Sequence, residues 1–217
     1  NAALEPEISD LARSLNKMGA KIKIEKNGII KIEGVKKLTK ANHKIMSDRI
    51  VAGTFVIAAV MLNKNFEVQE VESCHLEALT SSLKEMGAKL KIKKNSIQII
   101  PSKNLNGVKI QTAPYPGFPT DLQAQIMALM SISKGNSQIK ENIFENRFMH
   151  VPELNRLGAQ IKVKRDIAYI SGNRKLKGAQ VMASDLRASV SLVLAALCAE
   201  GKSVINRVYH LDRGYEK

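Results

Sequence analysis

The sequence has no tryptophan, and aromatic residues make up only 4% of its 217 positions. Proteins that hold single-stranded nucleic acid by base stacking use aromatic side chains as platforms, so this class is disfavoured. No apolar run reaches the roughly eighteen residues of a membrane-spanning helix. The chain starts without a basic, apolar leader, so we expect neither a signal peptide nor a membrane partner.

Cysteine is also scarce, with only Cys74 and Cys198 in the chain. Two thiols provide neither a disulfide framework nor a metal-ligand spacing, so we expect reduced structural cysteines, no metal and a reducing, cytoplasmic location. Phosphate-binding glycine loops, dinucleotide fingerprints, zinc-protease helices and hydrolase elbows are missing too. Short motifs of these kinds therefore assign no chemistry.

Acidic residues are outnumbered, and the net charge is +14 with a pI near 9.8. Such an excess is compatible with a basic nucleic-acid-binding module, which would bind DNA in a steeply salt-dependent way. The lysines are however scattered and alternate along predicted strands, as at Lys21 and Lys23 or Lys89 and Lys91. This pattern favours solvated strand faces, and an anionic small-molecule substrate is a further possibility.

The chain does contain an internal repeat, the first feature to look for in any sequence. Each copy has an apolar helix pattern that runs into a glycine able to cap the helix, followed by alternating apolar and polar residues typical of a strand. A short turn and a second strand complete a hairpin. The three copies are Leu15 to Ile24 with Gly19, Leu83 to Ile92 with Gly87, and Leu154 to Val163 with Gly158.

A second helix follows in each copy, and the unit is predicted as helix, hairpin, strand, helix, strand. Asp48, Asp121 and Asp185 precede these second helices, where a carboxylate is a good N-cap. The predicted second helices cover 50–62, 122–133 and 186–199, and the predicted final strands cover 66–71, 137–143 and 203–208. We predict a single domain over 1–217, with repeats at about 1–66, 67–139 and 140–204 and a truncated unit at 205–217.

The third copy departs from the apolar stripe of its first helix. The first two copies carry Ile8, Leu11, Leu15 and Met18, and Leu76, Leu79, Leu83 and Met86. The third has Arg147 and His150 in place of the first two apolar residues. An arginine in a core position is costly unless it faces water or an anion, so Arg147 is a candidate anion-binding residue.

Three further residues are candidates for chemistry. Asp121 follows a segment, 113–119, with three prolines and a glycine, which predicts a restricted loop and a carboxylate placed to accept a proton from a hydroxyl. Arg187 lies in the first turn of the third second-helix, where an anion is favoured. Arg213 follows the last predicted strand and is a third anion-binding candidate.

Several of these segments resemble bacterial UDP-N-acetylglucosamine 1-carboxyvinyltransferases, which belong to the enolpyruvyl transferase family. The resemblance covers essentially all 217 residues and is carried by residues 48–50, 53–55, 115–125, 145–154, 183–189 and 209–216. It implies an α/β (α+β) fold, an inside-out α/β barrel domain of three βαβαββ repeats, here the C-terminal domain and incomplete at both ends. The N-terminal domain of the same enzyme would be missing.

The resemblance also implies an activity. Family members of this kind transfer the enolpyruvyl group of phosphoenolpyruvate to the 3-hydroxyl of UDP-N-acetylglucosamine and release phosphate, in the first committed step of peptidoglycan synthesis. It implies no cofactor, a cytoplasmic enzyme of cell wall biogenesis, and no nucleic-acid partner. A non-catalytic scaffold remains an alternative, although the retained aspartate and arginines argue against it.

By resemblance, each candidate has a role. Asp121 matches the general base at the sugar hydroxyl, and Ile143 matches a residue that holds the sugar through its backbone. Arg147, Arg187 and Arg213 match arginines on the phosphoenolpyruvate side, Arg213 also as a catalytic residue. Asp48, Arg49, Glu145 and Asp185 match charged residues of the interdomain cleft, and Tyr115 replaces a common histidine. The family's reactive cysteine, lysine and asparagine lie in the missing part, so we expect the isolated chain to be inactive.

Overall fold

The computed structural model describes residues 2–25, 28–102, 104–172 and 175–215. The predicted turn of the first hairpin, at 26–27, and the last residue of the 209–216 segment lie outside these residues.

The first unit comprises α1 (Pro6–Lys17), β1 (Lys21–Glu25), β2 (Ile29–Glu33), α2 (Arg49–Met61) and β3 (Phe66–Gln69). The second comprises the 3-10 turn η1 (Ser73–Leu76), α3 (Glu77–Glu85), β4 (Lys89–Lys93), β5 (Ser96–Ile100), β6 (Lys109–Gln111), η2 (Thr120–Leu122), α4 (Gln123–Ile132) and β7 (Asn136–Lys140). The third comprises α5 (Val151–Arg156), β8 (Ile161–Lys164), β9 (Ile167–Ser171), β10 (Gln180–Met182), α6 (Leu186–Leu197) and β11 (Val204–Asn206), before η3 (Val208–Arg213).

The predicted order of elements is confirmed in the second and third units. In the first unit, residues 34–48 between the hairpin and α2 form no strand. The glycine caps are confirmed in all three: Gly19, Gly87 and Gly158 have φ values of 99°, 98° and 93°. Only glycine adopts this backbone conformation without strain, so each helix ends there and the chain turns into its hairpin.

The sheets join one unit to the next. β3 of the first unit runs antiparallel to β5 of the second, in the three-stranded order β3-β5-β4. In the same way β7 runs antiparallel to β9 of the third unit, in the four-stranded order β6-β7-β9-β8. β6 and β10 lie parallel to β7 and β11. The last strand of the first and of the second unit therefore pairs with a strand of the hairpin in the unit that follows.

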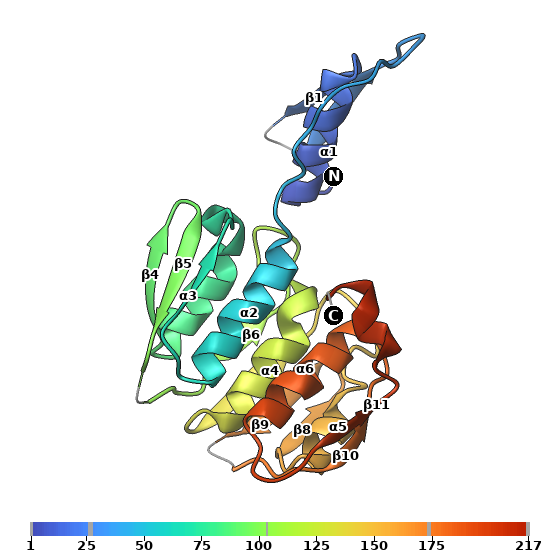
Figure 1. Ribbon diagram of the computed structural model, residues 1–217. Coiled ribbons are helices and arrows are strands. Elements are labelled where there is room, and N and C mark those ends of the chain that lie inside the picture. Colours follow the sequence, from blue (N-terminus) through green and yellow to red (C-terminus); the bar gives the residue numbers. More distant parts are fainter. Residues whose placement is uncertain (1, 26–27, 103, 173–174, 216–217) are drawn as a thin grey trace.

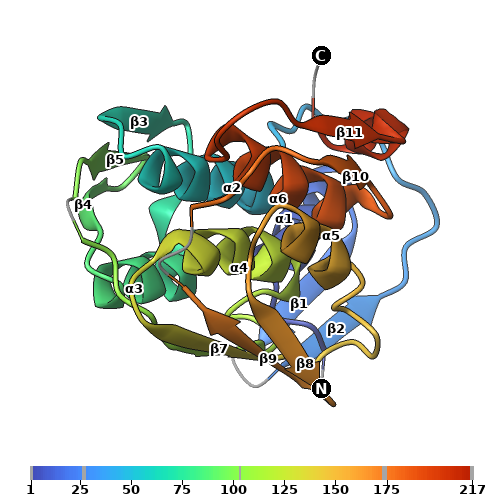
Figure 2. The ribbon, with the colours of Figure 1, turned by 90° about the horizontal axis from the view of Figure 1, so that it is seen from below.

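Three helices form the centre of the molecule. α2, α4 and α6 lie side by side, and three of the four sheets lie around them, while the β1–β2 sheet projects away with α1 (Figures 1 and 2). Every residue of α4 from Gln123 to Ser131 is buried, as expected for a helix that is apolar on all sides. The fold is thus mixed α/β with helices inside and sheets outside, and the described strands form four separate sheets rather than a closed barrel.

The first part of the first unit, α1 with its hairpin, lies apart from the rest of the molecule (Figure 1). In Figure 1 α1 and its hairpin project from the body at the end of the segment 34–48. The second apolar stripe is fully buried, with Leu79 and Leu83 at 0% exposure, whereas Leu11 of the first stripe is 57% exposed. The stripe was predicted equally in both helices, but in the first one Ile8, Leu15 and Met18 are only partly buried and Leu11 is exposed. The single domain remains a prediction.

The first helix of the third unit is shorter than predicted. α5 begins at Val151, and residues 145–150 form turns. Pro152 explains this, because proline lacks the N–H of a helix interior and its ring clashes with the preceding turn, so it is tolerated only at a helix start. Arg147 and His150 therefore precede the helix rather than lie on its apolar face.

Candidate functional site

Asp121 is held by an ordered proline-rich loop. Within that loop the Ala113 N–H donates to the Phe118 carbonyl (3.0 Å) and the Gly117 N–H donates to the Pro114 carbonyl (2.8 Å). The loop leads into η2, which places Asp121 one turn before the central helix α4. The restricted loop predicted from the prolines is thus present, and it ends at the candidate carboxylate.

Two arginines from different elements converge on Asp121. Arg147 Nη2 lies 2.9 Å from Oδ1, and Arg187 Nη2 lies 3.1 Å from Oδ2. All three side chains are partly buried, with 28%, 21% and 38% exposure for Arg147, Arg187 and Asp121. A guanidinium donates charge-assisted hydrogen bonds to carboxylates and phosphates alike. The two guanidinium groups are therefore hydrogen-bond donors suited to an anion, and here the anion that they bind is the Asp121 carboxylate.

The three aspartates do not share one role. Asp48 caps α2 by accepting from the Ile50 and Val51 N–H groups (2.8 and 3.0 Å), and Asp185 caps α6 by accepting from Arg187 and Ala188 (2.8 and 2.9 Å). These two caps are confirmed. The predicted cap at Asp121 is wrong, because η2 intervenes before α4 and no backbone N–H of the helix reaches its side chain. Both of its oxygens face the arginines instead.

Arg147 belongs to the loop that leaves β7. Its guanidinium lies 5.3 Å from the centre of the Phe144 ring, a cation–π contact, and Glu145 beside it is exposed. His150 ends this loop and is 3% exposed, and its imidazole N–H donates to the backbone carbonyl of Arg147. The buried histidine therefore fixes the segment that carries Arg147.

Burial lowers the pKa of His150 from 6.5 to about 4; Asp185 opposes the shift, and Arg147 adds to it. The folded protein thus holds the imidazole neutral, whereas the unfolded chain binds a proton below about pH 6.5. The contribution of His150 to the free energy of unfolding is fully present above the pKa of the unfolded chain, 6.5, and is lost as the pH falls from 6.5 towards 4.

We expect the free energy of unfolding to fall by about 1.4 kcal/mol per pH unit in that range through this residue. Urea denaturation of the wild type and of His150→Gln at pH 7, 6 and 5 measures it. The difference in slope between the two proteins isolates the histidine from carboxylates that titrate nearby. Equal slopes would show that His150 does not carry this pH dependence.

The other predicted residues are spread around this centre. Arg49, the first residue of α2, is 9% exposed; its Nε donates to Glu7 of α1 (2.8 Å) and its guanidinium lies 5.6 Å from the Tyr115 ring centre. It thereby links α1 to the proline-rich loop. Arg213 is exposed at the end of η3 and, within the described part of the chain, forms no salt bridge. The structure thus brings two of the three candidate arginines together.

Tyr215 is a site neighbour that sequence reasoning did not single out. Its hydroxyl donates to Thr54 Oγ1 of α2 (3.0 Å), and the buried Gln125 of α4 donates to the same oxygen (3.2 Å). Burial raises the pKa of the Tyr215 phenol, with a smaller opposing effect from Thr54 and Arg187. This contact anchors the segment that carries Arg213 beside the start of α6. Tyr215 lies in the segment 209–216, which carries part of the family resemblance, and that resemblance was the signal in the sequence that could have pointed to it.

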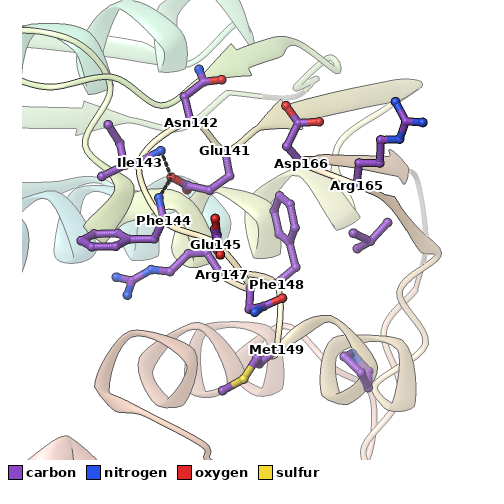
Figure 3. Close-up of a pocket in the computed structure, with 13 residues that line it drawn as sticks. Glu141, Asn142, Ile143, Phe144, Glu145, Arg147, Phe148, Met149, Arg165 and Asp166 are labelled. Carbon is purple, nitrogen blue, oxygen red and sulfur yellow. Dashed lines mark hydrogen bonds between the residues drawn. The ribbon is translucent and has the colours of Figure 1, made fainter.

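A pocket of about 860 Å³ opens beside the cluster. Its walls are the loop 141–149 on one side and the β8–β9 turn, with Arg165 and Asp166, on the other (Figure 3). Ile143, Glu145 and Arg147 all contribute to it. Within the described residues no group of three or more histidine, cysteine or acidic side chains could hold a metal ion. No helix there is long and apolar enough to cross a membrane.

Comparison with known proteins decides the family. The family model described as EPSP synthase (3-phosphoshikimate 1-carboxyvinyltransferase) matches residues 1–217. The chain belongs to the enolpyruvyl transferase family. Curated relatives named UDP-N-acetylglucosamine 1-carboxyvinyltransferase include those of Bdellovibrio bacteriovorus, 55% identical over 218 residues, and Pelagibacter ubique, 52% identical over 216 residues. Both matches cover 100% of this chain but only 53% and 52% of the relatives, so the chain spans about half their length.

Solved structures agree with the family's fold. The enolpyruvyl transferase NikO from Streptomyces tendae has a TM-score of 0.89 at 26% identity, over 98% of this chain and 51% of that one. EPSP synthase from Acinetobacter baumannii has a TM-score of 0.72 at 19% identity, over 94% of this chain and 51% of that one, a likeness of fold alone. The predicted fold and family are thereby confirmed.

Proposed function

We propose that this chain is the C-terminal half of an enzyme that transfers the enolpyruvyl group of phosphoenolpyruvate to the 3-hydroxyl of UDP-N-acetylglucosamine. The observation that carries the proposal is the convergence of Arg147 and Arg187 on Asp121 in a chain that is 52–55% identical to enzymes with this name. The product would feed peptidoglycan synthesis in the cytoplasm.

Each residue of the cluster has a part in this reaction. Asp121 takes the proton of the sugar 3-hydroxyl, whose oxygen bonds to C2 of phosphoenolpyruvate while C3 gains a proton. Loss of a C3 proton then expels phosphate and restores the double bond, so the atoms balance. Arg147 and Arg187, with Arg213 from the η3 end, bind the phosphate and carboxylate groups of phosphoenolpyruvate. Asp121 pairs with Arg147 and Arg187, and its single negative charge leaves the three-residue cluster with a net positive charge that favours the anionic substrate.

Ile143 holds the sugar through its backbone. Its N–H already donates to Glu141 (2.9 Å), so the carbonyl is the group left to contact the substrate. Asp48 and Asp185 line the cleft indirectly, because both carboxylates are used to cap helices. The exposed Glu145 faces the partner half of the protein, whereas Arg49 is buried against Glu7 and Tyr115 and supports the cleft from within this chain.

The test is phosphate release by the complete gene product that contains this chain, supplied with phosphoenolpyruvate and UDP-N-acetylglucosamine, with the enolpyruvyl sugar confirmed by mass. We expect turnover with this acceptor and none with 3-phosphoshikimate, the acceptor in the family model's name. Turnover with 3-phosphoshikimate but not with UDP-N-acetylglucosamine would contradict the proposed acceptor.

The 217-residue chain alone is the matched control. We expect it to release no phosphate, because a two-sided active site loses orientation and electrostatic stabilisation together when one side is removed. Phosphate release by the isolated chain would show that the essential chemistry lies in these residues alone.

A further inference from the structure

Glu141 is a buried carboxylate that the site residues above do not include. It follows β7 directly, is 4% exposed, and its backbone N–H donates to the Asp166 carbonyl (2.8 Å). Burying a carboxylate costs free energy unless hydrogen bonds replace those of water. A side chain held in this way indicates that its position in the fold matters.

Four donors satisfy the Glu141 side chain. Oε1 accepts from the Thr112 hydroxyl (2.8 Å), the Ile143 N–H (2.9 Å) and the Phe144 N–H (3.3 Å), while Oε2 accepts from the Thr120 hydroxyl (3.0 Å). Figure 3 shows the two backbone contacts as the loop turns around the carboxylate. Glu141 uses both of its oxygens: Oε1 binds Thr112 and the loop at 143–144, and Oε2 binds Thr120.

These donors connect the two substrate-facing parts of the proposed site. Thr120 is the residue before Asp121, and Ile143 is the proposed backbone contact to the sugar. Thr112, which is fully buried at the end of β6, also accepts from the Asn142 N–H (2.9 Å), so it braces the same loop. One carboxylate thereby sets the distance between the proposed base and the backbone that presents the hydroxyl to it.

We propose that Glu141 is a positioning residue that holds Asp121, through Thr120, and the Ile143 backbone in register for the acceptor hydroxyl. This inference rests on the proposed function. Glu141 touches no reacting atom and acts only through its neighbours. Its contribution is geometric, and misplacement of a base by about 1 Å is enough to cost roughly a hundredfold in rate.

Thr120 gives the cleanest test, because it can lose its hydroxyl without a change of size. In the complete gene product we expect Thr120→Val to lower kcat about tenfold, with Thr120→Ser close to the wild type since it keeps the donor. Glu141→Ala should lower kcat about a hundredfold, and Glu141→Gln less, because its remaining oxygen still accepts from the loop. Urea denaturation of each variant separates these losses from loss of folded protein.

A double-variant cycle distinguishes positioning from plain stabilisation. If Glu141 acts through Thr120 on Asp121, then Thr120→Val should cause no further loss of kcat in the Asp121→Asn background. The same tenfold loss in both backgrounds would overturn the proposal. So would a Glu141→Ala protein that is less stable but whose folded fraction keeps wild-type kcat and KM.

A spectroscopic measurement keeps this inference separate from the proposed function. If the wild type releases no phosphate, the proposed function fails whatever Glu141 does. The backbone amide resonances of Thr120, Ile143 and Phe144 then still report on the contacts. Glu141→Gln should shift those of Ile143 and Phe144 by weakening charge-assisted hydrogen bonds. If the amide resonances of Thr120, Ile143 and Phe144 are all unshifted in Glu141→Gln, Glu141 does not hold these segments.

Discussion

Replacing Asp121 by asparagine in the complete gene product is expected to lower kcat by about a thousandfold, in the range found when a general base is removed. The side chain keeps its size but no longer accepts a proton, while the proline-rich loop still holds it in place. KM for phosphoenolpyruvate should not rise, because the substitution releases Arg147 and Arg187 from their ion pairs. Initial rates of phosphate release measure both constants.

Asp166→Asn is the matched control. This carboxylate lies at the β8–β9 turn, across the neighbouring pocket from Arg147, and faces Lys140 at 3.8 Å. A change there should leave kcat unchanged, because exposed ion pairs contribute little. Wild-type kcat in Asp121→Asn, or an equal loss in both variants, would remove Asp121 as the base.

A second large effect is expected at Gly178. A methyl group on its Cα would lie 2.3 Å from the carbonyl oxygen of Lys202, in the backbone that leads into β11. Backbone cannot retreat as a flexible side chain does, so Gly178→Ala should lower the free energy of unfolding by about 3 kcal/mol. Urea denaturation of the isolated chain, followed by circular dichroism, measures this loss.

A second loop glycine supplies the control for this experiment. Gly34 directly follows β2 in the first unit, and nothing lies within 4 Å of a methyl group built there. Gly34→Ala should change stability by no more than about 0.5 kcal/mol. Similar losses at both glycines would show that the close approach to Lys202 is not what the third unit depends on.

The sequence was most informative where a signal is local. The capping glycines, the hairpins after them and the central helices each depend on residues within one turn or two, and all were predicted. The exposure of Leu11 was not predictable, because periodicity shows which face of a helix is apolar but not what covers that face. The early start expected for the third unit's first helix was wrong because the repeat was given more weight than Pro152.

The candidate site divides in the same way. Asp121, Arg147 and Arg187 could be picked out singly, but their meeting joins positions 26 and 66 residues apart, which no spacing reveals. Glu141 was missed altogether, since its partners Thr112 and Thr120 are 29 and 21 residues away. A glutamate after a strand is usually a solvated residue, and only the fold shows that this one is buried.

The sharing of sheets between units has a consequence for synthesis on the ribosome. β3 has no antiparallel neighbour until β5 has been made, and β7 has none until β9 has emerged. The first and second units therefore leave the exit tunnel with an unpaired strand edge, the kind of surface that invites wrong pairing. The nascent chain depends on steady elongation through the next hairpin, so a pause between β7 and β9 would be more harmful than one within a helix.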